Sequence, residues 1–176
     1  QQIATADGHF TICAIDHRGT LKAFINKGNP EAVDYWTMVQ YKMELCRALA
    51  PISSAILLDP VYGAPHAIAQ GILPRSTGLL VSLEASGYES QGDGRLTRLL
   101  EGWSVAKIKK MGASAVKLLL PYRPDLAETA HHQLETARQV ARECQENDIP
   151  FLVETVSYAI PGENPDSPQF AARKAG

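Results

Sequence analysis

Five short apolar runs recur along the chain, and each of them carries a charged residue or ends at one. They cover residues 10–15, 54–58, 78–83, 115–120 and 151–158. Because these runs are nearly continuous in hydrophobic residues, we expect each of them to form a buried strand. The last run contains Glu154. Burying its carboxylate without a partner would be costly, so we expect this strand to end at a polar site.

Segments with apolar residues at helical spacing separate most of these runs. The clearest helix signal begins at Asn29, an N-cap residue that is followed by Pro30 and Glu31, and it continues to about Pro51. Further helices are expected over residues 21–25, 66–70, 96–111 and 127–147, and a last one begins within 169–176. Strands that alternate with helices indicate an α/β fold in which helices cover a parallel sheet.

Charged residues lie on or just after all five runs. They are Asp16, Asp59, Glu84, Lys117 and Glu154. Any one of them, taken alone, is best explained as a helix cap or a partner for a neighbouring charge. The carboxyl ends of parallel strands meet at one edge of the sheet, however, and α/β proteins build their sites there. No glycine-rich phosphate loop follows any run, which argues against a Rossmann or P-loop protein.

Lys117 is the sharpest candidate, because its ammonium would be desolvated within an apolar strand unless it faced an anion. It has two chemical roles open to it: a nucleophile that forms a Schiff base, or a cation that binds phosphate or polarises an oxygen. Asp16 and Glu154 nearby would favour the charged form and the second role. A buried ion pair without catalytic function is the structural alternative.

The turn after the first run places Asp16, His17, Arg18 and Gly19 together. The fork of Arg18 suits phosphate or carboxylate, and Gly19 permits a close approach of the backbone. We interpret His17 as a loop residue rather than a metal ligand, since no second ligand stands at a suitable spacing. We expect no metal and no cofactor.

Other residues whose side chains could take part in chemistry are expected to have structural positions instead. We expect His131 and His132 to lie on the surface, Trp36 and Trp103 to pack in the core, and the polar loop 87–94 to form a lid or rim. Cys13, Cys46 and Cys144 are odd in number and lie within apolar patterns, which favours reduced, buried thiols.

Composition and charge narrow the partners. The 176 residues are 45% hydrophobic and 20% charged, with a formal net charge of −2 and no block of lysine or arginine. Nucleic acid and anionic membranes are therefore not expected as partners, and a small molecule is. The apolar runs are too short to span a membrane and no signal peptide is visible, so we expect a cytoplasmic protein.

Four motifs resemble the tagatose 1,6-bisphosphate aldolase family in sequence, order and spacing. They are AIDHRG at 14–19, AILLDPVYG at 55–63, AVKLL at 115–119 and FLVE at 151–154. This family consists of class I, Schiff-base aldolases and is related to the sulfofructose phosphate aldolases. The resemblance implies a (β/α)8 TIM barrel, of which residues 1–176 would form the first five βα units as a single domain.

The resemblance also implies roles for individual residues. Asp16, Lys117 and Glu154 would be catalytic and would surround a Schiff-base lysine that the sixth strand supplies, beyond Gly176. His17, Arg18 and Asp59 are the expected substrate-binding residues. The 176 residues alone would then be inactive, and their sheet would have two open edges.

The implied reaction is cleavage of a ketose bisphosphate to dihydroxyacetone phosphate and an aldehyde phosphate. Two alternatives stay open: an aldolase for sulfofructose phosphate or another ketose phosphate, and a regulatory protein that binds a phosphosugar without cleaving it. A homo-oligomer is also left open.

Overall fold

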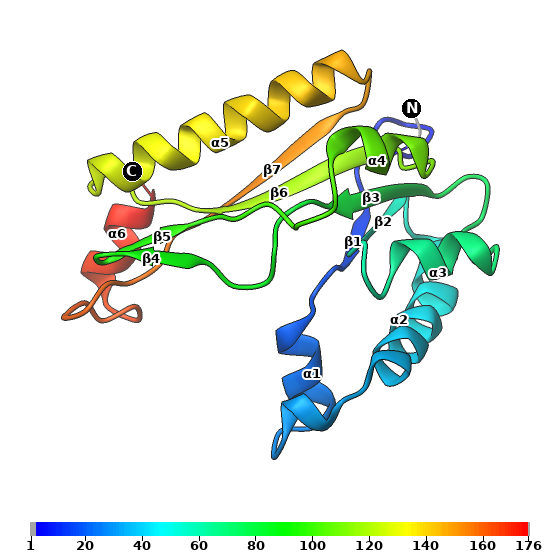
Figure 1. Ribbon diagram of the computed structural model, residues 1–176, viewed down its shortest axis with the longest axis horizontal. Helices are drawn as coiled ribbons and strands as arrows, with labels where there is room; N and C mark the ends of the chain where they lie inside the picture. The colour runs from blue at the N-terminus through cyan, green and yellow to red at the C-terminus, as the bar shows by residue number, and fades with distance from the viewer. Residues whose placement is uncertain (1–2, 176) are drawn as a thin grey trace.

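The computed structural model describes residues 3–175, and a five-stranded sheet runs through its centre (Figure 1). The strands are β1 (Ile12–Ile15), β2 (Ala55–Leu58), β3 (Gly78–Ser82), β6 (Ala115–Pro121) and β7 (Phe151–Val156). Their spatial order is β1-β2-β3-β6-β7, and every neighbouring pair is parallel. The five predicted strands and the α/β class are confirmed. Within the described residues, β1 and β7 each have a single paired neighbour, so both outer edges are open.

The register of the sheet brings the charged strand ends together. Ile15 of β1 pairs with Leu58 of β2, and Ser82 of β3 pairs with Lys117 of β6. On the far side, Leu119 of β6 pairs with Glu154. The carboxyl ends of the strands therefore meet at one edge, as the strand pattern predicted.

Helices follow the strands, and four of them pack against one face of the sheet. They are α1 (Gly19–Ile25), α2 (Tyr35–Leu49), α3 (Ala64–Ala69), α4 (Val105–Lys110), α5 (Ala127–Glu146) and α6 (Pro168–Ala175), with short 3-10 helices at Pro30–Ala32 and Ala50–Ile52. The main core joins α2 to α5 with the sheet through residues such as Met43, Ile108, Val140 and Val116. A smaller cluster on the opposite face contains Leu57, Leu80 and Ala115, against which Ile3 of the N-terminal segment packs.

The segment after β3 differs from the prediction. Residues 89–96 form an antiparallel hairpin of β4 (Glu89–Gln91) and β5 (Gly94–Leu96), where a loop and the start of a helix were expected. The helix α4 begins only at Val105, because Gly102 has a φ of +74° and interrupts the helical backbone. Ser104 then caps the new helix by accepting a hydrogen bond from the backbone N–H of Lys107. Gly112, with a φ of +97°, ends it as predicted.

The start of α2 also differs from the prediction. Asp34, rather than Asn29, is the N-cap, and its carboxylate accepts a 2.7 Å hydrogen bond from the backbone N–H of Thr37. The assignment of Trp36 to the core was wrong: the residue is 67% exposed, and its ring packs edge-on against Tyr35 and His66 instead of the sheet. Trp103 is partly buried against the core, as expected.

The three cysteines are free, and two of them, Cys46 and Cys144, are buried. Burial raises the pKa of the Cys46 and Cys144 thiols to about 11. His131 and His132 are exposed on α5, as expected. Among the described residues, no helix combines the length and apolarity needed to cross a bilayer.

Candidate active site

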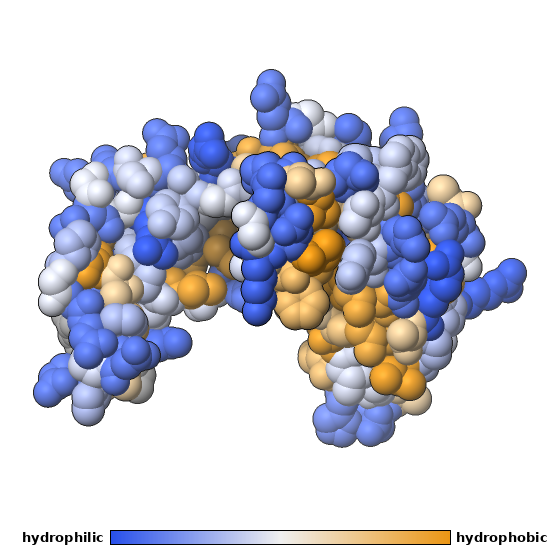
Figure 2. All heavy atoms as spheres, turned by 90° about the horizontal axis from the view of Figure 1, so that it is seen from below, coloured by the Kyte–Doolittle hydropathy of each residue, from blue (hydrophilic) through white to orange (hydrophobic). Residues whose placement is uncertain are grey.

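A cleft of about 420 Å³ opens at the carboxyl ends of the strands and contains most of the predicted site residues. Seen from below, the molecule is hollowed between a lobe of α1 and α2 and a lobe of the β4–β5 hairpin and α6 (Figure 2). The ionisable residues that line the cleft are Asp16, His17, Arg18, Glu84, Tyr88, Arg95, Lys117, Glu154 and Tyr158. This is the location that parallel α/β proteins use for catalysis.

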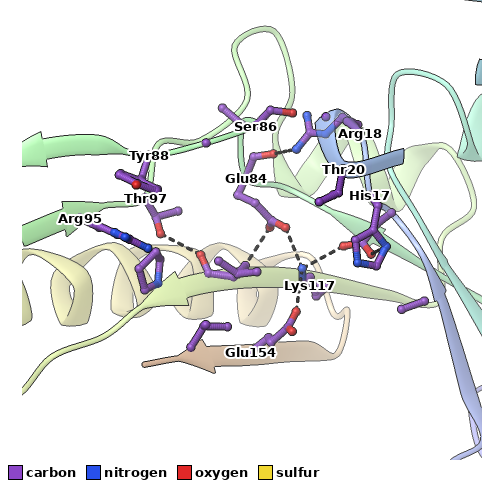
Figure 3. A pocket seen from close by; sticks show the side chains of 18 of the residues that line it. His17, Arg18, Thr20, Glu84, Ser86, Tyr88, Arg95, Thr97, Lys117 and Glu154 are labelled. Carbon is purple, nitrogen blue, oxygen red and sulfur yellow. Dashed lines mark hydrogen bonds and ion pairs between the residues drawn. The ribbon is translucent and has the colours of Figure 1, made fainter. Parts of the chain in front are cut away.

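Lys117 is the centre of this site (Figure 3). Its Nζ atom lies 2.9 Å from Asp16 Oδ2, 2.8 Å from Glu84 Oε1 and 3.0 Å from Glu154 Oε2, and its side chain is only 2% exposed. Burial alone would lower the pKa of Lys117, but the nearby carboxylates of Glu84 and Asp16 outweigh it and raise the pKa above its ordinary value. The side chain is therefore held as an ammonium.

The three carboxylates come from three different strands and differ in exposure. Asp16 follows β1 and Glu84 lies two residues after β3, and both side chains are 11% exposed. Glu84 is fixed further, because its Oε2 accepts a 3.1 Å hydrogen bond from the backbone N–H of Leu119. Glu154 lies on β7 and is 49% exposed. Three carboxylates around one ammonium leave a surplus of two negative charges when all are ionised, and the most accessible of them faces the cleft.

The two residues after Asp16 also line the cleft. The His17 side chain is 61% exposed, and its Nδ1 lies 3.9 Å from Asp16 Oδ1. Arg18 donates a 2.6 Å hydrogen bond from Nη2 to the backbone carbonyl of Glu84, which ties the turn after β1 to the end of β3. This contact occupies one of the five N–H groups of Arg18 and leaves others for a ligand.

Asp59, the sixth predicted site residue, is not brought to the cleft. It is fully buried, and its Oδ1 accepts hydrogen bonds from the backbone N–H groups of Val61 and Tyr62. Its Oδ2 lies 2.8 Å from Nζ of Lys42, which is also fully buried. The register of the sheet places the backbone of Asp59 at the carboxyl end of β2. The turn after β2 then directs its carboxylate toward Lys42 on α2 and away from the cleft.

Lys42 connects this buried pair to the cleft. Its ammonium donates to the carbonyls of Ile15 and His17, at 2.5 Å and 2.8 Å, which are the two residues that flank Asp16. Lys42 therefore holds the backbone of the turn that presents Asp16 to Lys117. The sequence carried a signal for this residue, since a lysine among Met38, Val39, Met43 and Cys46 breaks an otherwise apolar helix face.

Two other contributions to the cleft were not assigned a role from the sequence. Glu84 was expected at the same edge of the sheet as Asp16, and only the structure shows that it contacts Lys117. Arg95 and Tyr88 come from the hairpin, which the sequence pattern did not reveal. Among residues 3–175, no group of three or more histidines, cysteines or carboxylates is arranged to hold a metal ion.

Comparison with known proteins gives consistent matches. The model of the DeoC/LacD family aldolases matches residues 10–170. Tagatose 1,6-diphosphate aldolase 2 of Enterococcus faecalis is 39% identical over 158 residues, which are 89% of this chain and 46% of that protein. Tagatose 1,6-diphosphate aldolase 2 of Streptococcus mutans is 34% identical over 174 residues, which are 98% of this chain and 52% of that protein. The chain thus spans about half the length of the curated relatives it matches.

Solved structures agree on the fold. A Schiff-base-forming fructose-1,6-bisphosphate aldolase superposes with a TM-score of 0.56 at 18% identity, over 98% of this chain and 62% of the other. An archaeal fructose 1,6-bisphosphate aldolase superposes with a TM-score of 0.52, also at 18% identity, over 93% of this chain and 59% of the other. At this identity the likeness concerns the fold, which is a partial (β/α) barrel.

Proposed function

The chain belongs to the DeoC/LacD aldolase family, and on this premise we propose that the whole protein is a class I aldolase that cleaves a ketose bisphosphate. The products are dihydroxyacetone phosphate and an aldehyde phosphate. The observation that carries the proposal is the convergence of Asp16, Glu84 and Glu154 on the Lys117 ammonium, within 3.0 Å, at the floor of a cleft. The names of the relatives from Enterococcus and Streptococcus support a tagatose 1,6-bisphosphate substrate.

The raised pKa of Lys117 argues that this residue is not the nucleophile. A Schiff-base lysine must lose its proton before it attacks a carbonyl, and the carboxylates around Lys117 favour the ammonium. Lys117 is also the only lysine that lines the cleft among the described residues, so we infer that the nucleophilic lysine lies outside these 176 residues. Its amine attacks the substrate ketone and, after loss of water, forms an iminium that accepts the electron pair of the breaking carbon–carbon bond.

The residues of the cleft supply the proton transfers that accompany this chemistry. Glu154 is half exposed and faces the cleft, so it suits the acid/base role in forming and dehydrating the carbinolamine. Asp16 takes the proton of the substrate hydroxyl next to the breaking bond, which becomes the aldehyde oxygen. Lys117 orients substrate oxygens as a fixed cation, while Arg18 and His17 contact the substrate at the rim. No step requires a metal ion or an organic cofactor.

Borohydride trapping of the full-length protein with dihydroxyacetone phosphate, followed by peptide mapping, tests the proposal. We expect a reduced adduct on a lysine other than Lys117. The variant Lys117→Arg keeps the positive charge, so the adduct should still form in it, whereas turnover should fall. An adduct mapped to Lys117 in the wild-type protein would identify Lys117 as the nucleophile and overturn this assignment.

A coupled assay of tagatose 1,6-bisphosphate cleavage completes the test. Cleavage with release of dihydroxyacetone phosphate is the expected result. Binding of the bisphosphate in a calorimeter with neither cleavage nor adduct would instead identify a regulatory protein that recognises phosphosugars.

A further inference from the structure

Arg95 is held in the cleft by two aromatic rings. Its guanidinium carbon lies 4.4 Å from the ring centroid of Tyr88 and 4.4 Å from that of Tyr158. The hydroxyl of Tyr158 also accepts a 3.0 Å hydrogen bond from the backbone N–H of Arg95. The Arg95 guanidinium is therefore positioned by residues from three segments: the residue before β4, β5 itself and the chain after β7.

Among the described residues, no side-chain hydrogen bond or ion pair involves the N–H groups of the Arg95 guanidinium. Arg123, which also lies near Tyr158, shows the contrast: it forms ion pairs with the carboxylates of Asp125 and Glu163 and donates to a backbone carbonyl. Aromatic faces stabilise the charge of a guanidinium without consuming its five donors. Arg95 is thus positioned and still able to bind an oxyanion.

Charge is distributed unevenly along the cleft. Figure 3 shows Arg95 at one end and Lys117, with its carboxylates, toward the other. Thr97, two residues after Arg95, donates a hydrogen bond to the carbonyl of Leu119, so β5 lies beside the C-terminal half of β6. At about 3.3 Å per residue, the strand rises about 13 Å from Lys117 to Pro121. The cleft therefore suits an extended ligand with its reacting group near Lys117 and a negative charge at the far end.

We propose that Arg95, held by Tyr88 and Tyr158, binds the phosphate at the end of the substrate that lies farthest from the ketone. This inference rests on the proposed aldolase function and adds to it a residue that determines specificity. The fork of a guanidinium can donate two parallel hydrogen bonds to a phosphate, which a lysine in the same place cannot do. Arg95 then selects bisphosphates over ketose phosphates that lack the far phosphate.

Steady-state cleavage by the full-length protein tests this assignment. The substrates are tagatose 1,6-bisphosphate and tagatose 1-phosphate, which lacks the far phosphate. In Arg95→Gln we expect KM for the bisphosphate to rise at least about tenfold, while KM for the monophosphate stays unchanged. Arg95→Lys keeps the charge but loses the fork, so we expect an intermediate rise. Equal changes with both substrates, or no change with either, would overturn the assignment.

Arg98→Gln is the matched control, because Arg98 is an exposed arginine three residues further along the same segment and does not line the cleft. We expect wild-type KM for both substrates in this variant. If the wild-type protein cleaves neither sugar, the proposed function fails, and calorimetry with the same two ligands then decides the role of Arg95. A tenfold weaker affinity of Arg95→Gln for the bisphosphate alone supports it, and equal affinities of the variant and the wild type refute it.

Discussion

Two buried lysines contact the same turn around Asp16, and their surroundings differ. Lys42 is fully buried, forms an ion pair with the carboxylate of Asp59 and donates hydrogen bonds to two backbone carbonyls. Lys117 is almost as buried, but three carboxylates surround it and a cleft opens beside it. The Lys42 pair is balanced in charge, whereas the Lys117 cluster carries excess negative charge.

In the aldolase that we propose, this difference separates a structural ion pair from the catalytic cluster. The charge-balanced pair is fully buried and so out of reach of a ligand, and the hydrogen bonds of Lys42 to Ile15 and His17 fix the backbone of the turn around Asp16. An unbalanced cluster with an accessible carboxylate, Glu154, can exchange protons and accept a further cation. Burial and the presence of a carboxylate partner, which both lysines share, do not distinguish the two cases. The number of carboxylates and the presence of a cleft do.

Replacing Lys42 should have the largest effect on stability. In Lys42→Met, Asp59 stays buried without a counter-charge, and two carbonyls lose their donor. We expect the free energy of unfolding of the full-length protein to fall by about 3–5 kcal/mol, measured by urea denaturation. Arg138→Met removes an exposed ion pair with Glu135 and should cost less than about 1 kcal/mol. Equal costs in the two variants would contradict a structural role for Lys42.

Replacing Lys117 should affect activity more than stability. In Lys117→Met we expect kcat to fall about 10²–10³-fold, because a fixed positive charge near the reacting oxygens is lost. The loss of unfolding free energy should be smaller than in Lys42→Met, because the three carboxylates that lose their counter-charge line a cleft open to water, whereas Asp59 is fully buried. A coupled assay and urea denaturation of the same samples measure both quantities. A variant as unstable as Lys42→Met with wild-type kcat would reverse the comparison.

Two glutamates at the same ammonium provide a finer test. Glu154→Gln should lower kcat about 10²-fold or more as the acid/base group is lost, and should change the unfolding free energy by less than about 0.5 kcal/mol at this exposed position. Glu84→Gln is the matched substitution at a side chain that is 11% exposed and fixed by Leu119. It should cost about 1–3 kcal/mol of stability. Equal losses of unfolding free energy in Glu154→Gln and Glu84→Gln would contradict the expectation that the more buried carboxylate contributes more to stability.

The sequence predicts the fold well because the strand signal is strong and local. All five apolar runs are strands in the predicted order, and their parallel register alone brings Asp16, Lys117 and Glu154 to one edge. The pattern fails where local signals conflict. Leucines at helical spacing after residue 95 suggested a helix, but Gly102 and the capping residue Ser104 delay it until Val105.

Contacts between residues far apart in the chain could not be predicted. Asp59 has the same strand-end position as Asp16, yet its carboxylate turns toward Lys42, 17 residues earlier in the chain, instead of the cleft. Nothing in the sequence near Asp59 indicates this direction, because it depends on how α2 packs over the sheet. The role of Arg95 was missed for the same reason, because its position depends on contacts that the fold creates. Its partner Tyr158 is 63 residues away in the chain, and Tyr88 lies on its other side.

The smallest effect expected from the comparison of Lys42 with Lys117 is a loss of unfolding free energy at alkaline pH. The folded-state pKa of Lys117 is raised above the value of about 10.4 for a free lysine. A raised pKa means that the cluster contributes its full stability below about pH 10.4 and loses it as the pH rises toward the folded-state pKa. Between about pH 9 and pH 11, this loss amounts to about 1 kcal/mol of unfolding free energy.

The buried thiols complicate this measurement and make a control necessary. The pKa values of Cys46 and Cys144 are raised to about 11 in the folded protein, so these residues also lose stabilising free energy as the pH rises above about 8.5. Both thiols are present in wild-type protein and in Lys117→Met, so the difference between the two pH profiles isolates the lysine. Wild-type stability should fall more steeply than that of the variant above about pH 10. Parallel profiles would mean that the carboxylates do not hold Lys117 as an ammonium, and the contrast with Lys42 would then rest on the cleft alone.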